Sequence, residues 1–142
     1  MDIDDARARL AGCRVVRLAT VGADGRPHLV VVTFAVVGDR IYTAVDHKPK
    51  TTRALKRLRN IRDNPQVAVL ADHYEEDWGR LWWVRADGRG RVREAADVPA
   101  AIALLQRKYA QYGDRPPEGP VIEIGVDRWA GWSAADSGAG VR

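Results

Sequence analysis

The residues with the clearest chemical potential lie in a basic segment, residues 46–63. It reads DHKPKTTRALKRLRNIRD and holds seven Lys or Arg residues and one His, with no acidic residue between its terminal aspartates. Lys48, Lys50, Thr51 and Thr52 come directly before a predicted helix, where free backbone N–H groups and the helix dipole favour an anion. Ammonium and hydroxyl groups added at such a position predict a binding site for phosphate or another polyanion.

Two other interpretations of the basic segment stay open. A solvated face of a surface helix has the same composition and binds nothing. Nucleic acid is a rival ligand, because Arg and Lys spaced along a helix can follow a phosphate backbone. The predicted helix is short, however, its apolar stripe is needed for packing, and no nucleic-acid-binding motif surrounds it. We therefore expect an anionic small molecule, and no nucleic acid, as the partner.

The second group of candidate residues is aromatic and acidic. It comprises the run DHYEEDW at residues 72–78, followed by Trp82 and Trp83. A metal site is disfavoured, because His73 has no second histidine at ligand spacing and the carboxylates are consecutive rather than on one face. Tryptophan is suited to cover a flat ring or to fill a subunit interface, with packing in the core as an equal alternative. In a strand, Trp82 and Trp83 must face opposite ways, so at least one is expected outside the core.

No motif for side-chain catalysis is recognisable in the sequence. It has no dinucleotide-binding glycine motif after the first strand, no Walker loop, no nucleophile elbow and no Ser/His/Asp spacing. His28 follows Pro27 at the start of a strand, a position more typical of a structural histidine than of a general base. The catalytic residues stay unassigned. An anion site with aromatic cover but no catalytic dyad favours chemistry supplied by a bound cofactor.

The elements expected to position these residues are mostly strands. A short helix capped by Asp2 or Asp4 precedes a meander of strands at 13–21, 28–37 and 40–45. The later elements are, in order, a helix from Thr51 or Thr52 to before Pro65, a strand at 66–71, a hairpin of strands 81–86 and 89–93 turning at Asp87-Gly88, a helix capped by Asp97 that ends at Gly113, and a strand at 121–134.

No repeat or linker divides this pattern, so we predict one domain over residues 1–142. Its class is α+β with mostly antiparallel strands, arranged as a small β-barrel with short flanking helices. The near-continuous apolar run from Leu29 to Val37 predicts a strand covered on both faces, either a central barrel strand or a strand at a subunit interface. Since a barrel of this size has little interior space, a ligand is expected on its outside or between two copies.

Composition indicates the cellular setting. The net charge of +4 and the sequence pI of about 9.6 favour an anionic partner. The single cysteine, Cys13, cannot form an internal disulfide and is expected as a buried side chain in a reducing compartment. The acidic start of the chain does not have the pattern of a signal peptide, and no apolar run is long enough to cross a bilayer. We therefore expect a cytoplasmic protein without a membrane span.

Several strings of residues stand in a distinctive order. Ala19-Thr20 ends the first strand, DGRPH follows at residues 24–28, and RLRNIRDNP closes the basic segment at residues 57–65. This order resembles the pyridoxamine 5′-phosphate oxidase-like split-barrel family over most of the chain. Two further strings, DHKPKT at residues 46–51 and the run at 72–78 with LWWVR after it, resemble the branch described as probable coenzyme F420-dependent enzymes.

The resemblance implies a homodimeric split β-barrel of the FMN-binding type, with a flavin or deazaflavin in a groove at the subunit interface. The family's phosphate-binding segment falls on Lys48, Lys50, Thr51, Thr52 and Arg57, with Asn60 nearby. The family often has Lys where this chain has Arg57. Arginine keeps the charge and binds phosphate in a bidentate way, so binding is expected to survive while ligand preference can change.

For the ring of the cofactor, the resemblance implies contacts with residues 30–33, among them Val31, Val32 and Thr33. Trp78 or Trp82 of the other subunit would cover the ring. The implied activity is hydride transfer between reduced coenzyme F420 and an unsaturated small-molecule substrate. The phosphate and polyglutamate tail of this deazaflavin account for the basic segment better than the single phosphate of FMN. An FMN-dependent oxidase and a non-catalytic flavin- or tetrapyrrole-binding protein are the alternatives.

Overall fold

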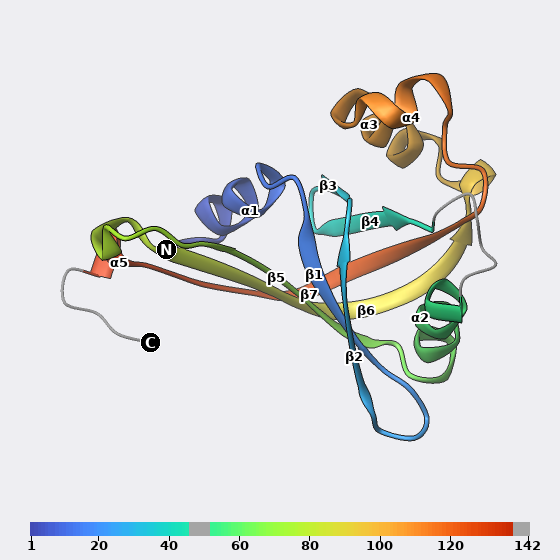
Figure 1. The fold of residues 1–142 in the computed structure, drawn as a ribbon, viewed down its shortest axis with the longest axis horizontal. Coiled ribbons are helices and arrows are strands. Elements are labelled where there is room, and N and C mark those ends of the chain that lie inside the picture. Colours follow the sequence, from blue (N-terminus) through green and yellow to red (C-terminus); the bar gives the residue numbers. More distant parts are fainter. Residues whose placement is uncertain (46–51, 138–142) are drawn as a thin grey trace.

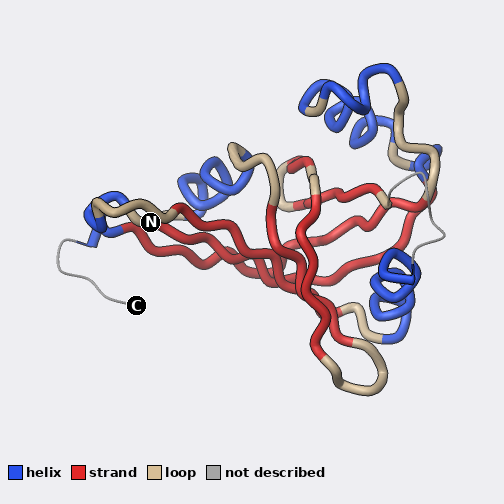
Figure 2. The backbone as a smooth tube through the Cα atoms, in the orientation of Figure 1, coloured by secondary structure: helices blue, strands red, loops and turns tan. Residues whose placement is uncertain are grey.

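The computed structural model describes the backbone of residues 1–45 and 52–137, and their side chains except those of 52–55 and 137. Within this part, one antiparallel sheet has the strand order β2-β1-β5-β6-β7-β4-β3 (Figures 1 and 2). The strands are β1 (Val16–Val21), β2 (Pro27–Val32), β3 (Ala35–Val37), β4 (Arg40–Ala44), β5 (Gln66–His73), β6 (Trp82–Glu94) and β7 (Pro120–Ser133). The helices are α1 (Ile3–Ala11), α2 (Thr52–Asp63), α3 (Pro99–Lys108), α4 (Ala110–Asp114) and α5 (Ala134–Ser137), with short 3₁₀ turns η1 (Trp78–Arg80) and η2 (Ala95–Asp97).

The predicted α+β class with antiparallel strands is confirmed, but the barrel is not closed. Strands β2 and β3 occupy the two edges of the sheet, yet only Thr33 and Phe34 separate them in the chain. The sheet must therefore curl until the end of β2 lies next to the start of β3. The described strands form no hydrogen-bonded ladder between these two edges, so the result is a split barrel.

The prediction of one continuous strand at residues 28–37 is wrong. The strand breaks at Thr33 and Phe34, where the chain passes from one sheet edge to the other. The alternative of a central barrel strand is also wrong, because β2 is an edge strand and Leu29 and Val31 are 68% and 60% exposed in the single chain. The other alternative, a subunit interface, stays a prediction.

The predicted hairpin at Asp87-Gly88 is wrong as well. Residues 82–94 form one long strand that pairs with β5 on one side and β7 on the other, and the Asp-Gly pair lies at a β-bulge. A Cβ atom at Gly88 would overlap the carbonyl oxygen of Gly125 on β7. The glycine therefore permits a close approach of two strands, a role that composition does not distinguish from a turn.

The main core fills the inside of the curled sheet. Leu18, Phe34, Val84 and Ile122 from different strands are fully buried there, together with Leu10 of α1. Two smaller clusters pack α3 against β3, β4 and β7. In Figure 1, α3 and α4 lie together at one end of the molecule, while α5 and the start of β6 lie at the opposite end.

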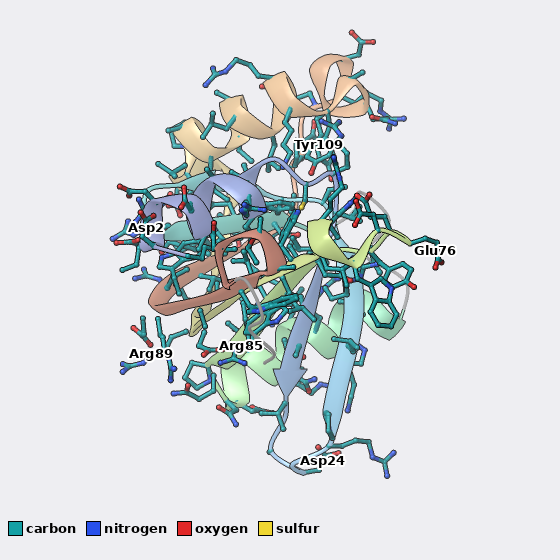
Figure 3. All side chains as sticks on the ribbon, turned by 90° about the vertical axis from the view of Figure 1, so that its left-hand side faces the viewer. Asp2, Asp24, Glu76, Arg85, Arg89 and Tyr109 are labelled. Atoms are coloured by element: carbon teal, nitrogen blue, oxygen red, sulfur yellow. The ribbon has the colours of Figure 1, made fainter. Side chains whose placement is uncertain are left out.

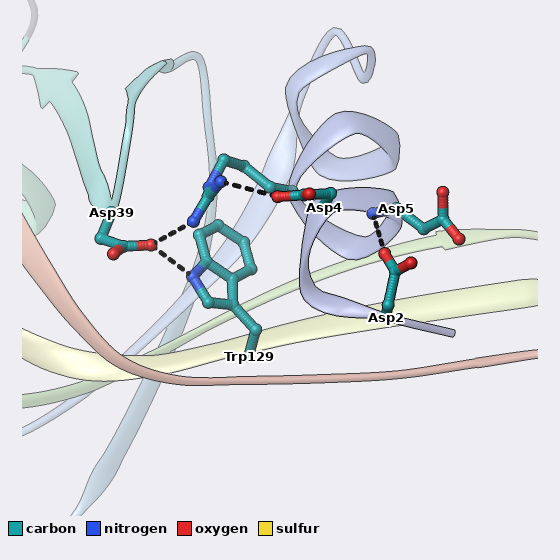
Figure 4. Close-up of polar contacts among 6 residues, drawn as sticks. Asp2, Asp4, Asp5, Asp39 and Trp129 are labelled. Carbon is teal, nitrogen blue, oxygen red and sulfur yellow. Dashed lines mark hydrogen bonds and ion pairs between the residues drawn. The ribbon is translucent and has the colours of Figure 1, made fainter.

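Helix α1 is joined to the sheet by a polar cluster (Figure 4). Asp2 caps the helix as predicted, accepting a hydrogen bond from the backbone of Asp5 at 2.8 Å. Arg7 donates to Asp39 in the β3–β4 turn at 2.6 Å, and Trp129 of β7 donates to the same carboxylate at 3.0 Å. These hydrogen bonds lower the pKa of the Asp39 carboxyl group. The cluster thus joins the helix to two strands that are distant in sequence.

Candidate functional site

A pocket of about 440 Å³ opens where the end of β2, the end of β4, helix α2 and helix α4 meet. Its lining contains four of the residues predicted to bind a cofactor. These are Val31, Val32 and Thr33 from the sheet edge and Arg57 from α2. The other described lining residues are Thr43, Ala44, Tyr109, Gln111 and Tyr112. The structure therefore brings together two groups of residues that the sequence places 24 positions apart, at 33 and 57.

Arg57 is the one cation among the described lining residues. Its side chain is half-buried, and its Nε–H group is buried without a hydrogen-bond partner in the described part of the chain. Burial lowers the pKa of the guanidinium group. No carboxylate of a described residue lies within ion-pair distance of it. A buried cation with an unsatisfied donor is costly, and an anion entering the pocket would supply both the charge and the acceptor.

The wall opposite α2 is a free sheet edge. Strand β2 pairs with β1 on one side and has no described strand on the other. Alternate backbone N–H and C=O groups along this edge therefore point away from the sheet and are open to a ligand. A planar molecule with ring carbonyl and imide groups can use such donors and acceptors.

Sequence reasoning missed the contribution of α4 and of the residue that precedes it. Tyr109, at the start of α4, accepts a hydrogen bond from the Phe34 amide at 3.1 Å, and its hydroxyl lies 2.8 Å from the Arg14 carbonyl oxygen. Tyr112 lies one turn later, 3.2 Å from Thr33 Oγ1. Figure 3 shows Tyr109 below the α3–α4 helices. Both tyrosines fall within the helix predicted to end at Gly113, and no local signal placed either of them at this pocket.

Asn60 lies in the core, away from the pocket lining. Its side chain is 2% exposed, and its amide donates to Thr20 Oγ1 on β1 at 3.1 Å. A Cβ atom at Gly22 would lie 2.5 Å from Asn60 Oδ1, so the β1–β2 turn is packed tightly against this amide. The contact fastens α2 to β1 and thereby sets the position of Arg57 one turn earlier.

The remaining predicted anion-binding residues are largely outside the description. Lys48, Lys50 and Thr51 lie outside the described residues, and Thr52 is the first residue of α2. On the described part of the helix, Lys56 is half-buried, while Arg59 and Arg62 are exposed. The basic character of α2 is therefore divided between one pocket residue and a solvent-facing surface.

Trp78 and Trp82 lie at the far end of the same chain. Trp82 stands eight residues before Gly90 on β6, and the Cβ position of Gly90 lies 3.3 Å from Ile61 of α2. Eight residues of strand span about 26 Å. Trp78 is 66% exposed and Trp82 is partly buried against the core. Neither tryptophan is among the described residues that line the pocket at Arg57.

The outer face of the sheet carries a second, larger hollow of about 830 Å³. Side chains of adjacent strands form rows across it, one of which contains Val31, Arg17, Leu70 and Arg85. The described lining also includes three tryptophans, at positions 82, 83 and 132. Val31 stands at the end of this row and lines the smaller pocket, so the pocket adjoins this mostly apolar face.

Other chemistry is limited in the described part of the chain. No group of three His, Cys, Asp or Glu side chains there is arranged to hold a metal ion. His73 and Glu75 form a 2.5 Å contact in the exposed loop after β5, and this hydrogen bond lowers the pKa of Glu75. None of the described helices combines the length and the apolar character needed to span a bilayer.

Comparisons with known proteins agree with this architecture. A family profile described as pyridoxamine 5′-phosphate oxidase matches residues 3–133. No curated protein matches the chain significantly. Among solved structures, a conserved hypothetical protein from Mycobacterium tuberculosis has a TM-score of 0.76 at 20% identity, with 100% of this chain and 91% of that chain covered.

Two further solved structures differ in the ligand that their descriptions name. An FAD-binding protein from Mesorhizobium loti has a TM-score of 0.67 at 20% identity and covers 92% of this chain and 94% of its own. HutZ, a heme storage protein from Vibrio cholerae, has a TM-score of 0.65 at 17% identity and covers 92% and 91%. At these identities the likeness establishes the fold and leaves the ligand of this chain open.

Proposed function

This chain belongs to the pyridoxamine 5′-phosphate oxidase family, and from that premise we propose that it is an oxidoreductase that uses the deazaflavin coenzyme F420. The Arg57 pocket would hold the cofactor, and an unsaturated small molecule would be the substrate. The observation that carries the proposal is the half-buried Arg57 guanidinium, which has an unpartnered Nε–H and faces a free strand edge.

The residues present fit such a cofactor. Arg57 would hold its phosphate through charge-assisted hydrogen bonds, with Lys48, Lys50, Thr51 and Thr52 expected to add contacts. The edge of β2 at Val31, Val32 and Thr33 would bind the polar rim of the ring through backbone groups. Once bound, a reduced deazaflavin supplies a hydride, so the protein needs to align the substrate and exclude water.

Charge favours a deazaflavin over FMN. The segment 46–63 contains seven Lys or Arg residues, whereas FMN offers one phosphate for them to bind. Coenzyme F420 carries a phosphate and a polyglutamate tail, and Arg59 and Arg62 on the exposed side of α2 are available to that tail. An FMN-dependent enzyme is the second candidate, because the matching family is described as an oxidase.

The site would be completed by a second copy of the chain. The pocket adjoins the apolar outer face at Val31, and Leu29, Val31 and Leu70 are exposed on that face in the single chain. Trp78 and Trp82 are not among the described lining residues of the Arg57 pocket in their own chain. In a homodimer, the far end of one chain would bring one of these tryptophans over the pocket of the other.

A side-by-side titration tests this proposal. Purified protein is titrated with coenzyme F420 and with FMN while ligand fluorescence is followed, and with hemin while its absorbance is followed. We expect micromolar or tighter binding of coenzyme F420 and weaker binding of FMN. Preference for FMN would transfer the assignment to the oxidase class. Binding of hemin alone would favour a tetrapyrrole-binding protein, and binding of none would refute the cofactor site.

The variant Arg57→Gln locates the site. Loss of charge-assisted hydrogen bonds to phosphate should weaken cofactor binding by about 1–3 kcal/mol, or about 5- to 150-fold. The matched control is Arg107→Gln, which removes the same charge from an exposed position in the last turn of helix α3, outside the described pocket lining. Equal effects of the two variants would mean that net charge, rather than a contact at Arg57, governs binding.

A further inference from the structure

Two hydroxyl groups form a pair on the wall of the Arg57 pocket. Thr33 Oγ1 and Tyr112 Oη lie 3.2 Å apart, and either atom can be the donor. Thr33 is in the two-residue gap between β2 and β3, and Tyr112 belongs to α4. Both side chains are half-buried and both line the pocket.

The neighbouring Tyr109 shows what a purely structural hydroxyl looks like here. It is 6% exposed, accepts from the Phe34 amide at 3.1 Å, and has the carbonyl oxygens of Arg14 and Phe34 at 2.8 and 3.2 Å. Its single proton is therefore already used by the backbone. Tyr109 has no donor left for a ligand.

The Thr33–Tyr112 pair is different, because one of its two hydroxyl protons has no acceptor among the described residues. Two hydroxyls have two protons, and the bond between them uses one. Neither hydroxyl forms another hydrogen bond with a described residue. One O–H group therefore stays available at the pocket wall, next to the open backbone edge of β2.

The electrostatics of the pocket select the kind of acceptor. Arg57 is the one charged side chain among the described lining residues, and no carboxylate is present there. We expect an anionic group of the ligand to bind at Arg57. The hydroxyl pair is uncharged and suits a neutral acceptor such as a ring carbonyl oxygen.

We propose that Tyr112 and Thr33 form a second polar subsite that receives a carbonyl oxygen of the ligand's ring, while Arg57 holds its anionic end. This inference rests on the proposed function, because it assumes that a ring-bearing anion occupies the pocket. It adds Tyr112 as a ligand-contacting residue and divides recognition into a ring end and an anion end.

The test compares ligands with and without phosphate. Dissociation constants are measured by fluorescence for FMN, riboflavin, coenzyme F420 and the dephosphorylated deazaflavin chromophore. The double variant Thr33→Val/Tyr112→Phe should weaken all ligands that the wild type binds by about tenfold, because it removes both hydroxyl protons, whereas either single variant leaves one O–H group free. Thr33→Ser keeps the hydroxyl and should bind like the wild type. Arg57→Gln should weaken only the phosphorylated ligands.

Thermal unfolding of each variant provides the fold control, since a change in binding counts only for variants that unfold like the wild type. If a ring ligand binds the wild type and the double variant binds it within about twofold, the subsite is refuted while the proposed function stands. A loss in the double variant that is confined to phosphorylated ligands also refutes it, because the hydroxyls would then serve the anion. A wild type that binds none of the four ligands refutes the proposed function and the subsite together.

Discussion

At the scale of single residues, the pocket depends on side chains that differ in how far their polar groups are satisfied. The Tyr109 hydroxyl is saturated by the backbone of Phe34 and Arg14, whereas the Nε–H of Arg57 has no partner among the described residues. Saturated buried groups stabilise the fold, and unsatisfied ones are available to a ligand at a cost in stability. The same pocket wall therefore contains structural residues and binding residues, which substitutions can separate.

Replacing Tyr109 by Phe should destabilise the protein by about 1–3 kcal/mol, because the Phe34 amide loses its acceptor and the Arg14 carbonyl loses its donor. Urea unfolding measures the change. Tyr74→Phe is the control, since Tyr74 is 62% exposed and its change should stay within about 0.5 kcal/mol. Equal stability of the two variants would mean that water replaces the Tyr109 hydroxyl without cost.

Lys108 should make stability depend on pH in the alkaline range. Its ammonium lies 3.6 Å from the centre of the Phe34 ring and donates to the Ala11 carbonyl at 3.2 Å. Burial, and next the charge of Arg14, lower its pKa from 10.5 to about 8. Below pH 8 both states hold the proton, so the folded protein bears the full cost of the partly buried charge. Between pH 8 and 10.5 the unfolded chain binds more protons at this site than the folded chain, so the contribution of Lys108 to stability rises with pH.

The measurement is the free energy of unfolding of the wild type and of Lys108→Met from pH 7 to pH 10. The difference, wild type minus variant, should rise as the pH passes 8. Comparison with the variant cancels the titration of groups that do not interact with Lys108, and Cys13, whose charge acts on Lys108, is replaced by Ser in both proteins. Parallel curves for the two proteins would contradict a lowered pKa.

At the scale of elements, the longest strands are joined by a close contact of glycines. Strand β6 runs without interruption from Trp82 to Glu94 because it pairs with β5 and β7, and its bulge lies at Asp87 and Gly88. The Asp-Gly pair has the composition of a hairpin turn. Pairing on both sides overrides that local preference, since a turn there would break two ladders.

Gly88→Ala should destabilise the protein by about 1–3 kcal/mol, because the added methyl group overlaps backbone atoms of β7 that cannot move without disturbing the ladder. Gly125→Ala on the adjacent strand is the matched control, as nothing lies within 4 Å of its added Cβ. Thermal or urea unfolding compares the two. Similar losses would indicate that the backbone conformation of glycine, rather than steric contact, matters at both positions.

At the scale of the whole molecule, the curled sheet leaves its outer face uncovered. Leu29, Val31 and Leu70 are exposed there, and the three tryptophans 82, 83 and 132 line a hollow of about 830 Å³. Exposed apolar surface of this extent marks an interaction site. A second copy of the chain would cover this face and bring the far end of β6 towards the pocket at α2.

Leu70→Arg should weaken self-association by tenfold or more, about 1.4 kcal/mol, because it places a charge on the apolar face. Sedimentation velocity at several concentrations measures this. Cofactor affinity should fall in parallel if a tryptophan of the partner covers the ring. Ile3→Arg on α1, where Ile3 is 55% exposed, is the control that should leave both unchanged. A Leu70→Arg protein that remains dimeric would place the interface elsewhere.

The sequence by itself determined the α+β class, a capped helix at the start of the chain with Asp2 or Asp4 as its cap, and the family, because periodicity, capping residues and motif strings are local properties. It also singled out Val31, Val32, Thr33 and Arg57. Only the tertiary structure decided that the sheet curls without closing, that Asp87-Gly88 is a bulge, and that Asn60 is a buried anchor. It alone brought Tyr112 to Thr33, 79 positions away. These features depend on which strands become neighbours, and local residue patterns do not encode such long-range pairing.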